Sequence, residues 1–237
     1  HGRDLIARMA RRGRGLPAHV IPLEVHHVAS LGLDLMLGAI ALGASRFVVL
    51  SAGPEPSAYD AALQGQLGLA QHVMGALGLG QGRFELLRCG DPAALDRAAW
   101  NAPRPRSLTP ATFNLSKAKR ETLDFVFDHL LRHAPARKEE IPLPADSPYG
   151  RVNVDKQKCT MCLACVGACP EGALIDAKDK PQLRFIERNC VQCGLCEKTC
   201  PEDAITLAQR LLLTPEATQP MVLNEDKVFA CVRCGKQ

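Results

Sequence analysis

Aromatic residues and long apolar runs are both scarce in this 237-residue chain. Only 4% of the residues are Phe, Trp or Tyr, although 46% are hydrophobic, so aliphatic side chains have to build the core. The longest apolar stretch, Leu35–Ala44, lies between Asp34 and Arg46 and is too short to cross a bilayer as a helix. It predicts a buried helix, and the sequence predicts no membrane span.

Motifs for several kinds of chemistry are also missing. No Gly-x-Gly-x-x-Gly follows the first predicted strand. Gly78 and Gly80 lie at the end of a predicted helix, where glycines that end the helix are a better interpretation than a nucleotide-binding loop. No Ser-His-Asp set, paired-acid arrangement or Cys-x3-Cys-x2-Cys motif can be identified. Because no secretory n-region and h-region are found either, we expect a cytoplasmic protein.

Cysteine, by contrast, is abundant, and eight of the eleven cysteines form two copies of one spacing. Each copy reads Cys-x2-Cys-x2-Cys-x3-Cys-Pro. The first run comprises Cys159, Cys162, Cys165 and Cys169, and the second comprises Cys190, Cys193, Cys196 and Cys200. Two residues between cysteines allow a tight loop whose thiolates converge on one cluster. The two runs therefore predict a ligand set for two [4Fe-4S] clusters.

Zinc and disulfides are the alternatives for these eight cysteines. Structural zinc sites use pairs of cysteines separated by a longer loop, whereas three cysteines at i, i+3 and i+6 crowd one face too tightly for a single tetrahedral site. Disulfides require an oxidising compartment, a secretory signal and usually a smaller domain. The sequence shows evidence for none of these.

The repeat extends beyond the cysteines, because Lys158–Leu174 (KCTMCLACVGACPEGAL) matches Asn189–Ile205 (NCVQCGLCEKTCPEDAI). This pattern resembles the bacterial-type dicluster ferredoxin domain over residues 150–213, which implies an α+β ferredoxin-like fold. In that family the fourth cysteine of each run binds the other cluster. The resemblance therefore implies two crossed ligand sets. They are Cys159, Cys162, Cys165 and Cys200 for one cluster, and Cys190, Cys193, Cys196 and Cys169 for the other.

Residues 1–100 alternate short apolar segments with helical patterns, which predicts an α/β domain with a small parallel sheet and flanking helices. The predicted strands are His19–Val25, Arg46–Leu50 and Gly82–Arg88, and the predicted helices are Leu33–Leu42, Tyr59–Leu77 and Pro92–Trp100, the last capped by Asp91.

This α/β stretch resembles the small domain of the delta subunit of methyl-viologen-reducing hydrogenase. The shared features are a Pro-containing strand, a helix ending in Gly43-Ala44, the strand residues Phe47–Leu50 and a Gly-Pro loop. Relatives carry cysteines here for a [2Fe-2S] cluster, and the corresponding loops of this chain have none. The resemblance implies a docking or spacing domain, and a redox partner such as a hydrogenase, formate dehydrogenase or heterodisulfide-reductase-like complex.

Residues 101–149 are rich in proline and predict stiff linkers around one amphipathic helix, Ser116–His133, which either bridges two domains, packs on a partner or joins the core. Residues 214–237 form a tail with Cys231-x2-Cys234, half of a zinc or iron site whose other ligands we expect outside this sequence. With His1 as the first residue, these features led us to expect a piece of a larger bacterial iron-sulfur protein.

The remaining candidates are weaker. His26-His27 could bind a metal, but no other ligand-type residues lie nearby in the sequence, and a pair of loop histidines is the simpler interpretation. Cys89 is expected to be a small buried apolar residue. The formal charge of +4 counts the cysteines as neutral, and two thiolate-bound clusters would bring the total to about zero. The basic balance is thus no argument for nucleic acid as a partner.

Three functions are consistent with these patterns. The first is an electron-transfer module, more a relay than a catalyst. The second is part of a larger redox enzyme whose catalytic flavin or metal domain lies outside this sequence. The third is an interaction scaffold with structural or regulatory clusters.

Overall fold

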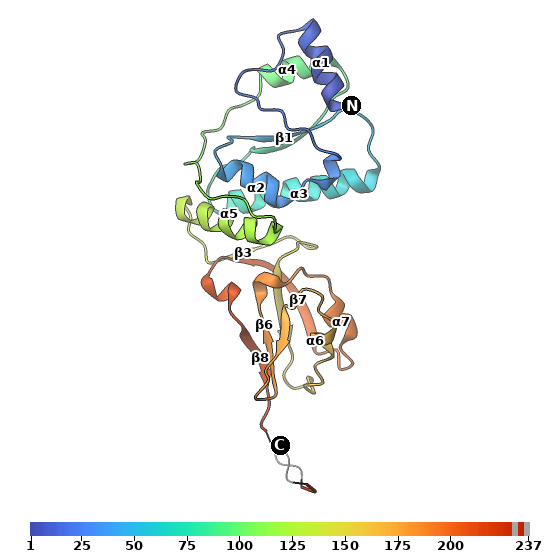
Figure 1. The fold of residues 1–237 in the computed structure, drawn as a ribbon, viewed down its shortest axis with the longest axis vertical. Helices are drawn as coiled ribbons and strands as arrows, with labels where there is room; N and C mark the ends of the chain where they lie inside the picture. The colour runs from blue at the N-terminus through green and yellow to red at the C-terminus, as the bar shows by residue number, and fades with distance from the viewer. Residues whose placement is uncertain (229–231, 235–237) are drawn as a thin grey trace. The chain divides into compact units, whose positions relative to one another are not determined.

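The computed structural model describes residues 1–228 and 232–234, and the chain divides into two units, His1–Arg137 and Lys138–Gln237 (Figure 1). The N-terminal unit contains α1 (Gly2–Arg12), η1 (Val28–Ser30), α2 (Leu33–Ala41), β1 (Phe47–Ser51), α3 (Ser57–Ala76), β2 (Phe84–Arg88), α4 (Pro92–Trp100) and α5 (Lys119–His133). Within the described part of the chain, no helix has the length and apolar character required to span a membrane.

Two parallel strands, β1 and β2, form the centre of the N-terminal unit, with Phe47 opposite Phe84. Helices lie on both sides of this pair, α1 and α4 on one and α2 and α3 on the other (Figure 1). The core under α1 and α4 consists of Leu5, Met9 and Leu95, which pack with the strand residues Leu50 and Leu87. The predicted small parallel sheet with flanking helices is therefore present.

The first predicted strand is wrong, so the sheet has two strands rather than three. Residues 19–25 contain no strand, and Ile21 and Leu23 are 90% and 67% exposed. Pro22 between them has no N–H to donate to a neighbouring strand. The other predicted strands and helices of this unit are confirmed, with Asp91 accepting a hydrogen bond from the N–H of Ala94 at the start of α4 (2.8 Å).

Glycine ends the long helix α3, as the sequence predicted. Gly78 adopts φ +71°, and its N–H donates to the carbonyl of Gly75 while the N–H of Leu79 donates back to Met74. A side chain at this φ would be strained, so glycine is the residue that permits this paired cap.

Helix α5 packs on α2 and belongs to the core of the N-terminal unit. Four residues of its predicted apolar face are buried, namely Leu123, Val126, Phe127 and Leu130. Of the alternatives for this helix, core packing is the one observed.

The loop before α5 is held by a buried arginine. Arg83 is 5% exposed and donates hydrogen bonds to the carbonyl oxygens of Leu79, Ser45 and Arg106, at 2.8, 2.8 and 2.9 Å. Desolvation lowers the pKa of this guanidinium from its ordinary value. One side chain thus joins the end of α3, the start of β1 and the proline-rich segment.

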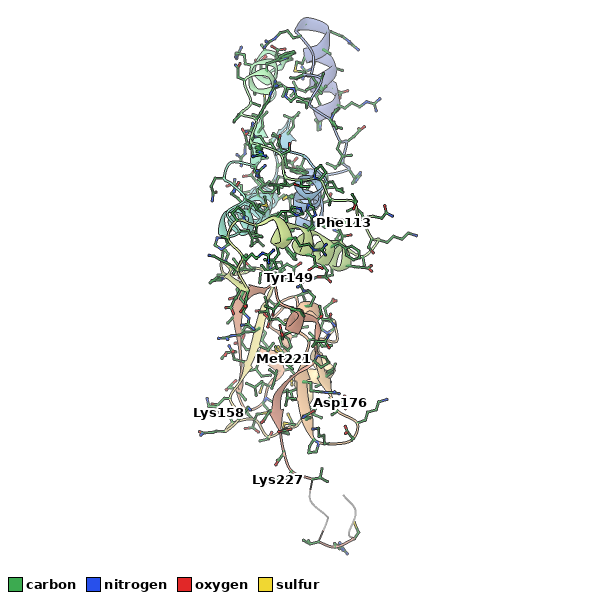
Figure 2. All side chains as sticks on the ribbon, turned by 90° about the vertical axis from the view of Figure 1, so that its left-hand side faces the viewer. Phe113, Tyr149, Lys158, Asp176, Met221 and Lys227 are labelled. Atoms are coloured by element: carbon green, nitrogen blue, oxygen red, sulfur yellow. The ribbon has the colours of Figure 1, made fainter. Side chains whose placement is uncertain are left out.

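The C-terminal unit contains two antiparallel sheets, ordered β3-β7-β4 and β5-β6-β8. Its elements are β3 (Glu140–Pro142), β4 (Gly150–Val154), α6 (Ala164–Ala168), β5 (Leu174–Asp176), β6 (Gln182–Phe185), η2 (Glu187–Asn189), α7 (Leu195–Thr199), β7 (Ile205–Leu212), η3 (Pro215–Thr218) and β8 (Met221–Glu225). Tyr149 and Lys158 flank β4, and Lys158 leads directly into the first cysteine run (Figure 2).

The sequence repeat appears here as two strand–loop–helix–strand halves that exchange partners. The first half is β4-α6-β5 and the second is β6-α7-β7. Strand β4 pairs with β7, and β5 pairs with β6, so each sheet takes one strand from each half. Strands β3 and β8, which lie outside the repeat, add an edge strand to each sheet.

We predict that Arg83→Met lowers the free energy of unfolding of the N-terminal unit by about 2–4 kcal/mol, because three carbonyl oxygens lose the hydrogen bonds that a buried guanidinium donates to them. Trp100, the one tryptophan of the chain, lies in this unit, so urea unfolding followed by its fluorescence measures the effect. Arg97→Met, an exposed change on α4, is the matched control and is expected to shift stability by less than about 0.5 kcal/mol. Equal effects of the two substitutions would contradict the role of Arg83.

Candidate metal centre

The eight cysteines of the two runs gather around two hollows in the C-terminal unit. The first hollow is lined by Cys159, Cys162, Cys165 and Cys200, and the second by Cys190, Cys193, Cys196 and Cys169. They enclose about 360 and 350 Å³ of empty space, part of it open to solvent. Three cysteines of each group come from one run and the fourth comes from the other.

Apolar side chains complete the lining of both hollows. The first is bordered by Leu183 and Ile205, and the second by Val152, Phe185 and Leu207. Cys165, Cys190 and Cys196 themselves belong to the buried hydrophobic core of this unit. The sulfur atoms therefore lie in a largely dry environment, although Cys162 and Cys193 are exposed.

Left-handed backbone conformations shape both cysteine loops at equivalent positions. Met161 and Leu163 have φ of +57° and +58° in the first loop, and Gln192 and Gly194 have +56° and +77° in the second. Non-glycine residues in this region cost free energy and concentrate at functional sites. Such residues turn successive backbone N–H groups toward the inside of a loop, where they can face an anion.

Backbone N–H groups do point at sulfur in both halves. The N–H of Ala173 donates to Sγ of Cys169, and the N–H of Ala204 donates to Sγ of Cys200, both at 3.3 Å. In the second loop, the backbone N–H of Gln192 donates to Sγ of Cys190 at 3.4 Å. These donors favour a negatively charged sulfur over a neutral thiol.

Burial acts in the opposite direction on the same thiols. Desolvation raises the pKa of Cys165 and Cys190 and, with the repulsion of neighbouring cysteines added, raises that of Cys196 to about 11. Such thiols stay protonated at neutral pH unless a cation compensates the thiolate charge. The donor set therefore fits a positively charged iron-sulfur core, for which four thiolates around a space are the required arrangement.

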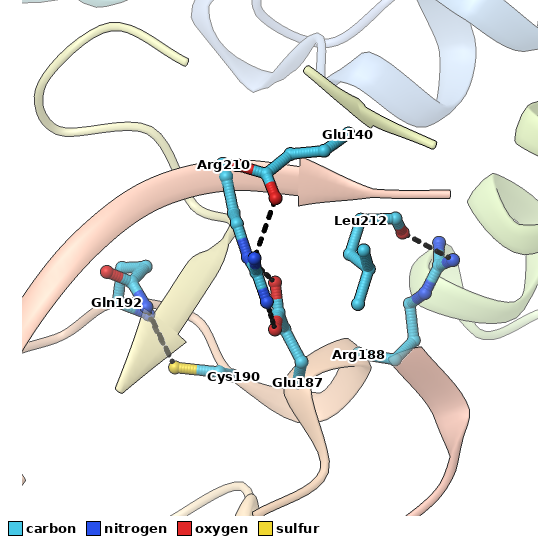
Figure 3. A network of polar contacts seen from close by, with 7 residues as sticks. All are labelled: Glu140, Glu187, Arg188, Cys190, Gln192, Arg210 and Leu212. Carbon is cyan, nitrogen blue, oxygen red and sulfur yellow. Dashed lines mark hydrogen bonds and ion pairs between the residues drawn. The ribbon is translucent and has the colours of Figure 1, made fainter. Parts of the chain in front are cut away.

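A buried ion pair holds the second loop against the sheet (Figure 3). Arg210 of β7 donates to both carboxylate oxygens of Glu187, at 2.8 and 2.6 Å, and also to Glu140 at 2.7 Å. Glu187 is 4% exposed, and its carbonyl accepts the N–H of Cys190 (3.0 Å). The hydrogen bond that Arg210 donates to Glu187 is the largest cause that raises the pKa of Arg210.

Other predicted candidates do not join these groups. His27 caps η1, because its Nδ1 accepts the N–H of Ala29 and its Nε2 lies 3.3 Å from Glu55, while His26 is exposed. Cys89 is half-buried rather than buried, and its thiol donates to the carbonyl of Asp91 (3.2 Å).

The half-site at Cys231 and Cys234 stays a prediction. Cys234 is exposed, and Cys231 lies outside the described residues. Among residues 1–228 and 232–234, no group of three or more His, Cys, Asp or Glu side chains could hold a single metal ion. The two cysteine groups differ from a site for a single metal ion, because the four cysteines of each group line a hollow instead of converging on one position.

Sequence reasoning missed the polar residues around the second group. Gln192, Glu187 and Arg210 lie near Cys190, yet only Gln192 stands inside a cysteine run. The sequence signal that could have indicated Gln192 is its polar side chain, because the equivalent position of the first run holds Met161.

Comparison with known proteins agrees with this geometry. A family model described as the 4Fe-4S dicluster domain matches residues 158–205, a stretch that contains both cysteine runs. No curated protein matches the chain significantly. The match supports iron-sulfur binding by this part of the C-terminal unit.

We predict that Glu187→Gln lowers the free energy of unfolding of the C-terminal unit by about 3 kcal/mol, because it removes the buried negative charge and one of the two oxygen acceptors that pair with the largely buried guanidinium of Arg210. Anaerobic urea unfolding followed by visible iron-sulfur absorbance measures this change. The matched control is Glu140→Gln, since Glu140 pairs with the same Arg210 but is 45% exposed. Its effect is expected to stay within about 1 kcal/mol, and a control effect as large as that of Glu187→Gln would disprove the burial argument.

Proposed function

We propose that this protein relays single electrons through two [4Fe-4S] clusters to or from a partner oxidoreductase. The observation that carries the proposal is the lining of the two hollows, in which three cysteines of one run meet the fourth cysteine of the other. This arrangement supports Cys159, Cys162, Cys165 and Cys200 as one ligand set and Cys190, Cys193, Cys196 and Cys169 as the second.

A fully cysteine-ligated [4Fe-4S] cluster supplies reversible one-electron chemistry and offers no open position to a substrate. The residues of this chain then have three tasks. The cysteines hold the metal, the apolar lining limits the access of water, and the backbone N–H groups of Ala173 and Ala204 stabilise negative charge on sulfur. The apolar lining leaves few water molecules to reorient when the charge of the site changes, which favours rapid electron exchange.

Contact with a partner requires a short path to the protein surface, and the exposed residues near the second group offer one. Cys193 is exposed, and Leu195, two positions later at the start of α7, is 44% exposed although it is a large apolar side chain. We infer that a redox partner approaches this edge of the domain.

For the N-terminal unit we propose a docking role without a cluster of its own. Cys89 is its single cysteine, and one thiol cannot hold an iron-sulfur cluster. The parallel β1–β2 sheet with helices on both sides is consistent with the delta-subunit resemblance, which suggested docking.

Metal analysis tests the proposal directly. We predict about eight iron and eight sulfide per chain of anaerobically purified protein, as two four-iron clusters require. Dithionite reduction is expected to produce EPR signals of two interacting reduced clusters. Zinc without sulfide would overturn the proposed function, and iron that dithionite cannot reduce would favour a structural role.

The crossed ligand sets predict a specific outcome for Cys200→Ala. Loss of this ligand is expected to weaken the cluster held by Cys159, Cys162 and Cys165, although these residues belong to the other run. Iodoacetamide labelling under anaerobic conditions, followed by peptide mass spectrometry, should find these three thiols alkylated at least tenfold faster than in the wild type, because a thiolate released from metal reacts freely.

Cys169→Ala is the matched variant and is expected to release the opposite set, Cys190, Cys193 and Cys196. If each substitution instead exposed the cysteines of its own run, the ligand sets would be uncrossed.

A further inference from the structure

The two cysteine groups are not equivalent, although the loops that hold them are. Gln192 and Met161 occupy the same position, two residues after the first cysteine of each run. They also share the same backbone conformation, with φ of +56° and +57°. The loops therefore differ at this position in side-chain chemistry and not in path.

Gln192 directs its side-chain amide at the sulfur of the second group (Figure 3). Its Nε2 donates a hydrogen bond to Sγ of Cys190 at 3.2 Å, in addition to the backbone N–H of the same residue at 3.4 Å. The thioether of Met161 has no N–H or O–H, so it can make no corresponding bond to Cys159. Sulfur ligands of a cluster only accept hydrogen bonds, so the amide orientation observed is the one that suits them.

A glycine on the neighbouring strand creates the space for this amide. A Cβ atom at Gly150 of β4 would lie 2.7 Å from Cδ of Gln192 and would also collide with the carbonyl of Ala208. The Oε1 atom of Gln192 is buried and has no hydrogen-bond partner among the described residues. Burying an amide oxygen without a partner costs free energy. The hydrogen bonds from Gln192 to Sγ of Cys190 offset this cost.

We propose that Gln192 tunes the reduction potential of the site formed by Cys190, Cys193, Cys196 and Cys169, and makes it higher than that of the other site. The proposal rests on the proposed function, since it requires a redox cluster in each hollow. Reduction adds one electron from a one-electron donor and neither makes nor breaks a bond. The added negative charge spreads onto sulfur, and an N–H dipole aimed at sulfur stabilises it.

This difference would give the relay an uneven energy profile. The electron would reside preferentially at the second site, whose edge carries the exposed Cys193 and Leu195. Gln192 acts through Cys190 and is therefore a positioning and tuning residue rather than a catalytic one.

The test is an anaerobic redox titration of the full chain, followed by EPR, on the wild type and on Gln192→Met. Methionine is the matched replacement because Met161 already adopts this backbone conformation in the other loop. The wild type is expected to show two potentials. In the variant the higher potential should fall and the lower potential should stay unchanged. At an applied potential equal to the higher wild-type value, the ratio of reduced to oxidised cluster at the second site is expected to be roughly threefold lower in the variant than in the wild type.

Gln157→Met is the control, because it makes the same chemical change at an exposed position two residues before Cys159. Unchanged potentials in Gln192→Met, with iron and sulfide contents equal to the wild type, would overturn this inference and leave the proposed function standing. A wild type without two reducible clusters would instead overturn the proposed function itself.

A second measurement covers the case in which the variant fails to assemble its clusters. Wild-type protein is labelled with nitrogen-15 at the side-chain amide of glutamine only and is then partly reduced. Pulsed EPR should detect coupling of this nitrogen to the cluster that is reduced first. A coupling confined to the cluster that is reduced second, or no coupling at all, would overturn the inference.

Discussion

Sulfur inside a hydrophobic core is the constraint on which the C-terminal unit depends. Cys165, Cys190 and Cys196 occupy core positions next to Leu174 and Phe185, where burial raises the pKa of the thiol. Several features of the surrounding structure stabilise negative charge on these sulfur atoms. Left-handed residues curve the loops, backbone N–H groups reach the sulfur atoms, and the proposed metal supplies the compensating positive charge. We therefore expect folding of this unit and binding of the proposed metal to be coupled.

The exchange of strands makes the two halves of the repeat depend on each other. Because β4 pairs with β7 and β5 pairs with β6, neither half of the repeat has a complete sheet of its own. The fourth cysteine of each run lines the hollow formed by the other run. The Glu187–Arg210 pair adds a polar connection between the second loop and β7. Backbone pairing and cysteine grouping make the two halves interdependent, whereas the Glu187–Arg210 pair stabilises the second half internally.

Local patterns in the sequence were sufficient for much of the fold. Cysteine spacing indicated both loops, Asp91 and Gly78 indicated helix ends, and the apolar face of α5 was correct because these signals act over a few residues. The segment 19–25 shows the limit, since its apolar pattern resembles a strand but Ile21 and Leu23 find no partner in the described structure and remain exposed. Long-range pairs such as Glu187 with Arg210, and the sharing of space between Gly150 and Gln192, depend on tertiary contacts that no local pattern encodes.

The crossed grouping of cysteines also has a consequence for synthesis of the chain. The second group takes Cys169 from the earlier run, so it has all four members once Cys196 has been added. The first group has three members much earlier but waits for Cys200. Both groups thus become complete between Cys196 and Cys200, along α7. Neither group can therefore have its full set of cysteines before synthesis reaches α7.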